Sequence, residues 1–175
     1  MTDDSTADNT TTDHLPSPLS DEDIATAYHE AGHAIVAVAL GKPVAKLTIE
    51  RNSMRLGQCQ MSHRRGQPVK DELEVQMMIM LGGVVAEARY TGEYNWDGAR
   101  QDMIGIRRLS RVRAGSDAQA ERLQQKMLSK TDHLLDQSGH WESVVAIVEE
   151  LKKNKSLSGR AVQHIFDSIM ARIDL

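Results

Sequence analysis

Two histidines and a glutamate form the most chemically informative pattern in this chain. The sequence reads HEAGH from His29 to His33, an HExxH motif with Glu30 directly after the first histidine. In a helix, residues i and i+4 share a face, so both imidazoles can bind one metal ion. Neutral imidazole is a good zinc ligand, and the adjacent carboxylate can accept a proton from a water molecule that the metal activates. The spacing therefore predicts a Zn²⁺ site with Glu30 as the catalytic base.

The motif leaves the third metal ligand undefined. A catalytic zinc site needs three protein ligands and one open position. The motif does not continue to a further histidine at short spacing, because Ala34, Ile35 and Val36 follow directly. Several acids and histidines are candidates, and spacing alone does not choose among them: His63, Glu87, Asp97, Asp102, His133, His140 and His164. Apart from this role, the four histidines in that group are expected at the surface.

The composition indicates one folded domain behind an acidic segment. The chain has 175 residues, a net charge of −4, 40% hydrophobic residues and one cysteine. The whole charge excess lies in residues 1–20, which hold aspartates but no lysine or arginine. We expect residues 1–19 to form a disordered acidic tail and residues 20–175 to form the folded domain.

Several classes of protein are disfavoured by the same composition. No apolar run approaches the ~20 residues of a membrane helix, and no basic and apolar leader opens the chain. A single cysteine cannot form an internal disulfide, and mild acidity argues against nucleic acid as the partner. We therefore expect a cytoplasmic protein with no membrane span.

Hydrophobic periodicity predicts a mainly α fold with a small β-hairpin. The hydroxyl of Ser20, followed by acidic residues, starts a helix that carries the motif and ends near Gly41. Residues 44–51 and 57–62 read as two strands joined by a turn. Further helices are expected from Pro68 to about residue 88, and over 98–112, 117–137, 141–153 and 158–172, with the last of them forming a C-terminal helical bundle.

Glycines inside two of these helices predict close contacts. Gly32 lies within the motif helix, and Gly82 and Gly83 interrupt the next one. Each costs about 1 kcal/mol relative to alanine inside a helix, so a close approach of backbone or ligand is the expected reason for it. Asp97 is expected to cap the helix over 98–112.

Three segments give the chain a resemblance to a known family. TAYHEAGHA at residues 26–34, LGG with a following AE at 81–87, and GARQD at 98–102 resemble TAYHEAGHA, GGRLAE and GASND in the peptidase domain of the FtsH-type ATP-dependent zinc metalloproteases. Residues 44–57 resemble the strand, turn and second strand of that domain. The resemblance implies a helical zinc-metallopeptidase fold in which Asp102 completes the zinc site with His29 and His33.

The sequence also departs from that family. No nucleotide-binding motif GxxxxGK[ST] occurs in it. We therefore expect a zinc-dependent metalloendopeptidase without its own ATPase, which hydrolyses peptides or unfolded proteins. A separate ATPase or unfoldase and further copies of the chain remain open as partners. The alternative is a catalytically silent zinc-binding adaptor or regulatory domain of the same fold, against which the intact Glu30 argues.

Two further roles complete the predicted site. Glu87 is expected to hydrogen-bond a ligand imidazole, the alternative being an ordinary solvent-facing glutamate. The second strand is expected to hold substrate through main-chain hydrogen bonds, the alternative being an edge that only closes the core. The residues expected to hold substrate are Gly57, Gln58, Cys59 and Gln60. Cys59 has no activating base in the sequence and is expected to be unreactive.

A basic run near the middle of the chain is expected to be a solvated helix face. The alternative is a contact for an acidic partner or for the acidic tail. The run consists of Arg107, Arg108, Arg111 and Arg113.

Overall fold

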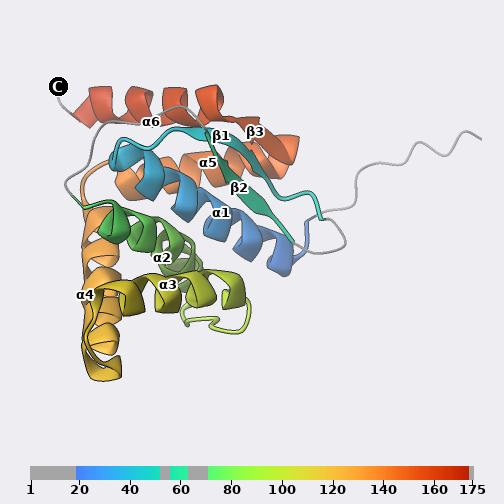
Figure 1. Cartoon of the computed structure of the whole chain (residues 1–175). Coiled ribbons are helices and arrows are strands. Elements are labelled where there is room, and N and C mark those ends of the chain that lie inside the picture. Colours follow the sequence, from blue (N-terminus) through green and yellow to red (C-terminus); the bar gives the residue numbers. More distant parts are fainter. Residues whose placement is uncertain (1–18, 52–55, 63–70, 174–175) are drawn as a thin grey trace, which may run out of the picture.

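Six helices and a small sheet build the part of the chain that the structure describes (Figure 1). The structure is a computed structural model, and it describes residues 19–51, 56–62 and 71–173. The helices are α1 (Asp21–Ala39), α2 (Glu72–Thr91), α3 (Arg100–Arg113), α4 (Asp117–Asp136), α5 (His140–Asn154) and α6 (Gly159–Ile173). The strands are β1 (Val44–Thr48), β2 (Gln58–Met61) and β3 (Ser156–Ser158). The prediction of a mainly helical fold with a small sheet is confirmed. Of the predicted acidic tail, residues 1–18 lie outside the described residues.

Helix α1 is the central element of the core. A capping box fixes its start: the Ser20 hydroxyl accepts from the Asp23 N–H at 3.2 Å, and the Asp23 carboxylate accepts from the Ser20 N–H at 3.0 Å. Every residue from Glu30 to Val38 is buried. Helices α2 and α5 both pack against α1, and the sheet lies nearby (Figure 1). The motif therefore lies on the most enclosed helix of the fold.

Glycines allow α1 and α2 to pack at very short range. A Cβ atom at Gly82 would lie 2.6 Å from the Gly32 carbonyl oxygen and 2.8 Å from the Val36 side chain. A Cβ atom at Gly32 would collide in turn with the Gly82 carbonyl. The expected close approach is confirmed, because only residues without a side chain let the two backbones meet here.

The sheet is antiparallel, with β1 in the middle of the order β2-β1-β3. Leu47 of β1 lies opposite Cys59 on β2 and opposite Leu157 on β3, and its side chain is fully buried. The β1–β2 hairpin was predicted, but β3 was not, since its three residues are too few to show an alternating pattern. Among the described residues, β2 has no strand on its outer side, so its outer edge is open.

Helix α2 begins later than predicted. Asp71 caps it, with its side chain accepting from the Glu74 N–H at 3.2 Å, so the first helical residue is Glu72. The expected start at Pro68 lies outside the described residues. None of the helices in the described ranges combines the length and apolar character needed to cross a bilayer.

The start of α3 also differs from the prediction. Its first residue is Arg100, and no side chain of the preceding residues caps the helix. Asn95, not Asp97, makes the turn before it: the Asn95 side-chain oxygen accepts from the Gly98 N–H at 2.9 Å. An asparagine amide forms the same kind of local turn as a carboxylate, and sequence alone did not separate the two residues.

Candidate metal centre

His29, His33 and Asp102 come together at one point, although Asp102 lies 73 positions after His29. The Oδ2 atom of Asp102 is 3.1 Å from Nε2 of His29 and 3.5 Å from Nε2 of His33. One potential ligand atom from each residue lies within 4.8 Å of the other two. Helix α1 supplies both histidines and the first turn of α3 supplies the aspartate, so rigid elements position all three.

Hydrogen bonds fix the orientation of both imidazole rings. Nδ1 of His29 lies 2.8 Å from Oε2 of Glu87 and donates to it. Nδ1 of His33 lies 2.7 Å from the Ile79 carbonyl oxygen and donates to that atom. Each ring therefore directs its Nε2 atom toward Asp102. Two imidazole nitrogens and one carboxylate oxygen match the donor set of a catalytic zinc site, so these residues fit that metal.

Gly83 of α2 provides the space in which the two rings lie. A Cβ atom at this position would be 2.6 Å from Cε1 of His33 and 2.7 Å from Cδ2 of His29. Any side chain here would displace one of the rings. This glycine therefore belongs to the metal centre as well as to the helix contact.

The centre favours positive charge. Burial lowers the pKa of His29, but hydrogen bonds to Asp102 and Glu87 outweigh burial and raise the pKa to about 10. Burial raises the pKa of Asp102, but hydrogen bonds from His29 and His33 prevail and hold it well below its ordinary range. Burial also raises the pKa of Glu87, but hydrogen bonds from His29 and Asn95 prevail and lower it. Carboxylates that stabilise a proton on His29 are equally suited to stabilise a cation bound in its place.

Glu30 lies beside the ligand atoms, between α1 and the sheet. Its side chain is buried, with 8% of the residue exposed. Burial raises its pKa and prevails over His33 and His29, which lower it. A Cβ atom at Gly57 would be 2.9 Å from Cγ of Glu30, so the chain just before β2 lies against this carboxylate. The Cys59 N–H also hydrogen-bonds to it.

The thiol of Cys59 faces the same acidic surroundings. Burial raises its pKa well above the ordinary range, and the nearby Glu30 and Asp102 raise it further. A thiol with a raised pKa is a poor nucleophile, which agrees with the expectation that Cys59 is unreactive.

Within the described residues, the other candidates for the third ligand are not part of this cluster. Asp97 is exposed in the loop before α3, and His133 and His164 are exposed on α4 and α6. His140 was expected at the surface, and this is wrong: it is 6% exposed. Its ring packs near Phe166 at 5.5 Å, and its Nδ1 atom donates to the Leu134 carbonyl at 2.5 Å, so the start of α5 is buried. His63 lies outside the described residues.

Two contributors to the centre were not found from the sequence. The Ile79 carbonyl orients His33, and a backbone atom leaves no signature in the residue types. Asn95 donates from its amide to Oε1 of Glu87 at 3.0 Å, which ties the loop before α3 to the carboxylate that holds His29. A turn-forming asparagine just before a helix start was the available signal for this residue.

Comparisons of the sequence with known proteins give matches to one family of peptidases. Residues 19–114 match the sequence profile of peptidase family M41. The chain is 37% identical over 90 residues to "ATP-dependent zinc metalloprotease FtsH" of Protochlamydia amoebophila, which is 49% of this chain and 10% of that protein. It is 47% identical over 75 residues to the FtsH of Acidobacterium capsulatum, covering 39% of this chain and 12% of that protein.

A longer alignment extends toward the C-terminal helices. The chain is 28% identical over 157 residues to "ATP-dependent zinc metalloprotease FtsH 1" of Thermomicrobium roseum, which is 87% of this chain and 22% of that protein. The chain thus spans only 10% to 22% of the length of these curated relatives. The profile match covers more than half of the 175 residues and includes the motif histidines, Glu30, Glu87 and Asp102. On these grounds, the chain belongs to peptidase family M41.

Proposed function

We propose that this chain is a zinc-dependent metalloendopeptidase that hydrolyses peptide bonds in peptides or unfolded protein segments. The observation that carries the proposal is the convergence of two imidazole nitrogens and a carboxylate oxygen beside the buried Glu30. Membership of a peptidase family supports the same reaction class.

His29, His33 and Asp102 are the residues that would hold the zinc ion. When bound, the ion supplies a Lewis acid that polarises the scissile carbonyl and makes water more acidic. Glu87 keeps the His29 ring in the ligating orientation through its 2.8 Å hydrogen bond. The Asp102 carboxylate reduces the net positive charge of the site and, as one of only three protein ligands, leaves a position open.

Glu30 is the proton carrier in this proposal. Its position next to His29 on α1 places the carboxylate beside the ligand atoms and not among them. Glu30 takes a proton from the attacking water as the water oxygen bonds to the carbonyl carbon of the scissile peptide. It then delivers that proton to the amine nitrogen as the C–N bond breaks.

The open edge of β2 is the proposed site for the substrate main chain. The Ser62 N–H bonds to the Pro43 carbonyl at 2.9 Å, on the β1 side. Because N–H groups alternate along a strand, Gln58 and Gln60 also direct their N–H groups toward β1. The outward groups are those of Cys59 and Met61. We therefore refine the predicted strand: Gly57 and Met61 offer main-chain atoms to substrate, Cys59 offers only its carbonyl because its N–H is bound to Glu30, and Gln58 and Gln60 hold the strand in the sheet.

The reaction is tested with Glu30→Gln. We expect zinc content to be unchanged, while cleavage of an unstructured protein falls by about 100- to 10,000-fold, the usual contribution of a general base. Glu93→Gln, an exposed glutamate in the loop after α2, is the matched control and should cleave normally. Wild-type protein with full zinc occupancy and no cleavage would instead support the silent zinc-binding alternative.

Strand-like binding is tested with N-methylated substrates. Each peptide carries one N-methyl group, placed at successive positions on one side of the scissile bond. We expect kcat/KM to fall at alternate positions only, because every second substrate N–H faces β2. A uniform effect at all positions contradicts strand addition without touching the zinc site.

A further inference from the structure

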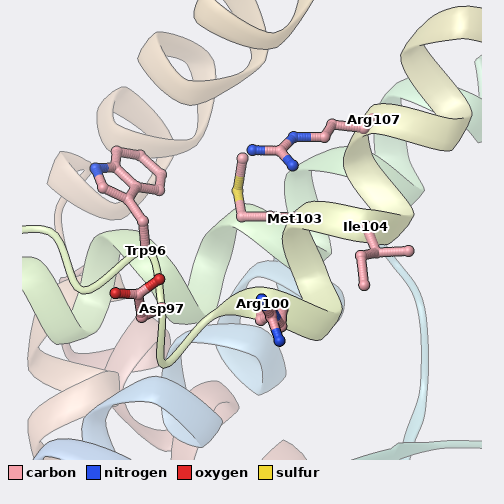
Figure 2. A pocket seen from close by; sticks show the side chains of 6 residues that line it. All are labelled: Trp96, Asp97, Arg100, Met103, Ile104 and Arg107. Atoms are coloured by element: carbon pink, nitrogen blue, oxygen red, sulfur yellow. The ribbon is translucent and has the colours of Figure 1, made fainter.

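A pocket lies on the outer face of α3, apart from the metal centre. Its volume is about 350 Å³, and its lining comprises Trp96, Asp97, Arg100, Met103, Ile104 and Arg107 (Figure 2). At about 100° of rotation per helical residue, Arg100, Ile104 and Arg107 share one face of α3, and Asp102 points roughly the opposite way. One helix therefore carries the third metal ligand on its inner side and this pocket on its outer side.

The apolar wall of the pocket is exposed and held in place. Trp96, one of the two tryptophans in the chain, is 45% exposed, and Ile104 is 54% exposed. The Trp96 ring stacks on Tyr94 with centroids 4.9 Å apart and planes within 12°. Asn95, between these two residues, is anchored to Glu87 at 3.0 Å. A large aromatic side chain that is fixed in water is typical of a contact surface.

Figure 2 shows Trp96 facing Met103 across the pocket, with the guanidinium of Arg107 extending over Met103. Arg107 and Arg100 are both exposed, and neither forms an ion pair within the described part of the chain. In contrast, Arg111 and Arg113 of the same helix pair with Asp117 and Asp71. The pocket thus combines apolar walls with two uncompensated positive charges.

We propose that this pocket captures an acidic and apolar segment of a polypeptide substrate. An apolar side chain of the segment lies between Trp96 and Met103, and carboxylates on either side of it meet Arg100 and Arg107. The inference rests on the proposed peptidase function, because the captured segment belongs to the chain that is cleaved. Since the pocket and Asp102 lie on opposite sides of α3, the captured segment is separate from the cleaved one.

Binding is measured through Trp96 without turnover. Trp141→Phe leaves Trp96 as the single tryptophan, and Glu30→Gln in the same protein prevents cleavage. The probe is a short unstructured peptide with one leucine between glutamates. We expect a saturable change in Trp96 fluorescence, with at least about tenfold weaker binding of a peptide in which lysines replace the glutamates. Equal binding of the two peptides, or no saturable change, overturns the proposal.

Two neighbouring arginines provide a matched pair of variants. Arg107→Glu should weaken binding of the acidic peptide by about tenfold or more. Arg108→Glu makes the same charge change at an exposed position outside the pocket, and should alter binding by no more than about twofold. Ile104→Gln should weaken binding while leaving its salt dependence unchanged. Equal losses for Arg107→Glu and Arg108→Glu overturn the proposal, since only net charge would then matter.

The acidic segment of this same chain is the competing occupant. Replacing Asp3, Asp4, Asp8 and Asp13 by asparagine removes the charge of this segment from the 175-residue chain. Unchanged peptide affinity supports capture of a separate chain. A gain of about tenfold or more assigns the pocket to the N-terminal segment and overturns the proposal. Peptide binding without cleavage by the wild-type protein rejects the peptidase function alone, and cleavage without binding at Trp96 rejects the capture site alone.

Discussion

The two motif histidines differ in what holds the nitrogen that faces away from the metal centre. A carboxylate of Glu87 accepts from His29, whereas the neutral carbonyl of Ile79 accepts from His33. A charged acceptor increases the basicity of an imidazole more than a neutral one does. His29 is therefore expected to be the stronger of the two ligands, and to depend on a residue that is not itself a ligand.

This dependence predicts the effect of Glu87→Gln. The amide keeps the size of the side chain and one acceptor oxygen but loses the negative charge. We expect zinc affinity to fall by about 10- to 100-fold, as measured by competition with a chelator of known affinity. Glu93→Gln serves again as the control, because this exposed residue lies outside the centre. Equal affinities for the two variants contradict a positioning role for Glu87.

At the residue scale, sequence reasoning reached as far as local spacing allows. Four positions along one helix were enough to predict that His29 and His33 share a face. Asp102 is 73 positions from His29, so no local rule joins them, and the residue was singled out only through the family resemblance. The Ile79 carbonyl could not be found at all, since every residue type has the same backbone oxygen.

At the scale of elements, the contact between α1 and α2 sets the position of the motif. The Gly32 and Gly82 backbones touch, and Gly83 lies directly under the two imidazole rings. The two helix backbones can approach this closely because each of these three glycines has a hydrogen atom in place of a side chain. The depth at which the two histidines lie therefore depends on the three glycines.

The contact predicts that Gly82→Ala is destabilising. The new methyl group would lie 2.6 Å from the Gly32 carbonyl oxygen, so the helices must separate. We expect a loss of about 1–3 kcal/mol in the free energy of unfolding, measured by urea denaturation, with weaker zinc binding. Gly115→Ala is the control, since its Cβ would meet only the Gln119 side chain at 3.2 Å. A stable Gly82→Ala protein would show that the contact is less tight than described.

The N-terminal cap of α1 predicts a pH dependence of stability. The pKa of Asp23 is lowered from 3.8 to about 2 in the folded chain, most of all by the hydrogen bond from the Ser20 hydroxyl and to a smaller extent by Arg51, although burial opposes both. A lowered folded-state pKa stabilises the fold above the unfolded value, and that contribution is lost as pH falls through about 2. Because the group is near the surface, its contribution is below about 1 kcal/mol.

Asp23→Asn measures this contribution. The variant should be less stable than wild type at neutral pH, and the difference in unfolding free energy should shrink between about pH 4 and pH 2. Asp21→Asn, in the same first turn but outside the capping box, controls for the helix dipole. A difference that grows on acidification would be inconsistent with the capping role.

Elements with strong periodicity or clear caps were predictable, and those made by pairing were not. Ser20 and its acidic neighbours marked the start of α1 within one residue. Strand β3 has only three residues and exists because Leu157 pairs with Leu47, more than a hundred positions earlier. His140 was misplaced because packing between helices, and not its own polarity, determines its burial.

At the scale of the whole molecule, the candidate metal centre joins elements that are distant in the sequence. Helix α1 supplies two of the proposed ligands, α3 supplies the third, and α2 orients the first. A ligand that binds the folded chain, and not the unfolded chain, adds its binding free energy to the stability of the fold.

Zinc should therefore raise the melting temperature in a concentration-dependent manner. A free zinc concentration of about 100 times Kd corresponds to about 2.7 kcal/mol of added stability. The measurement is thermal unfolding of chelator-treated protein with increasing zinc, and magnesium is the control ion because it prefers oxygen ligands. Asp102→Asn should show a smaller shift. A melting temperature independent of zinc would contradict a metal centre at this place.

The separation of 73 positions between His29 and Asp102 also has a kinetic consequence. Closing so long a loop costs chain entropy that no local contact repays, so we expect these two residues to meet late on the folding pathway. An interaction that forms after the transition state for folding changes the unfolding rate and leaves the folding rate unaltered. A bound ion would then slow unfolding, and so lengthen the lifetime of the native chain, without speeding its folding.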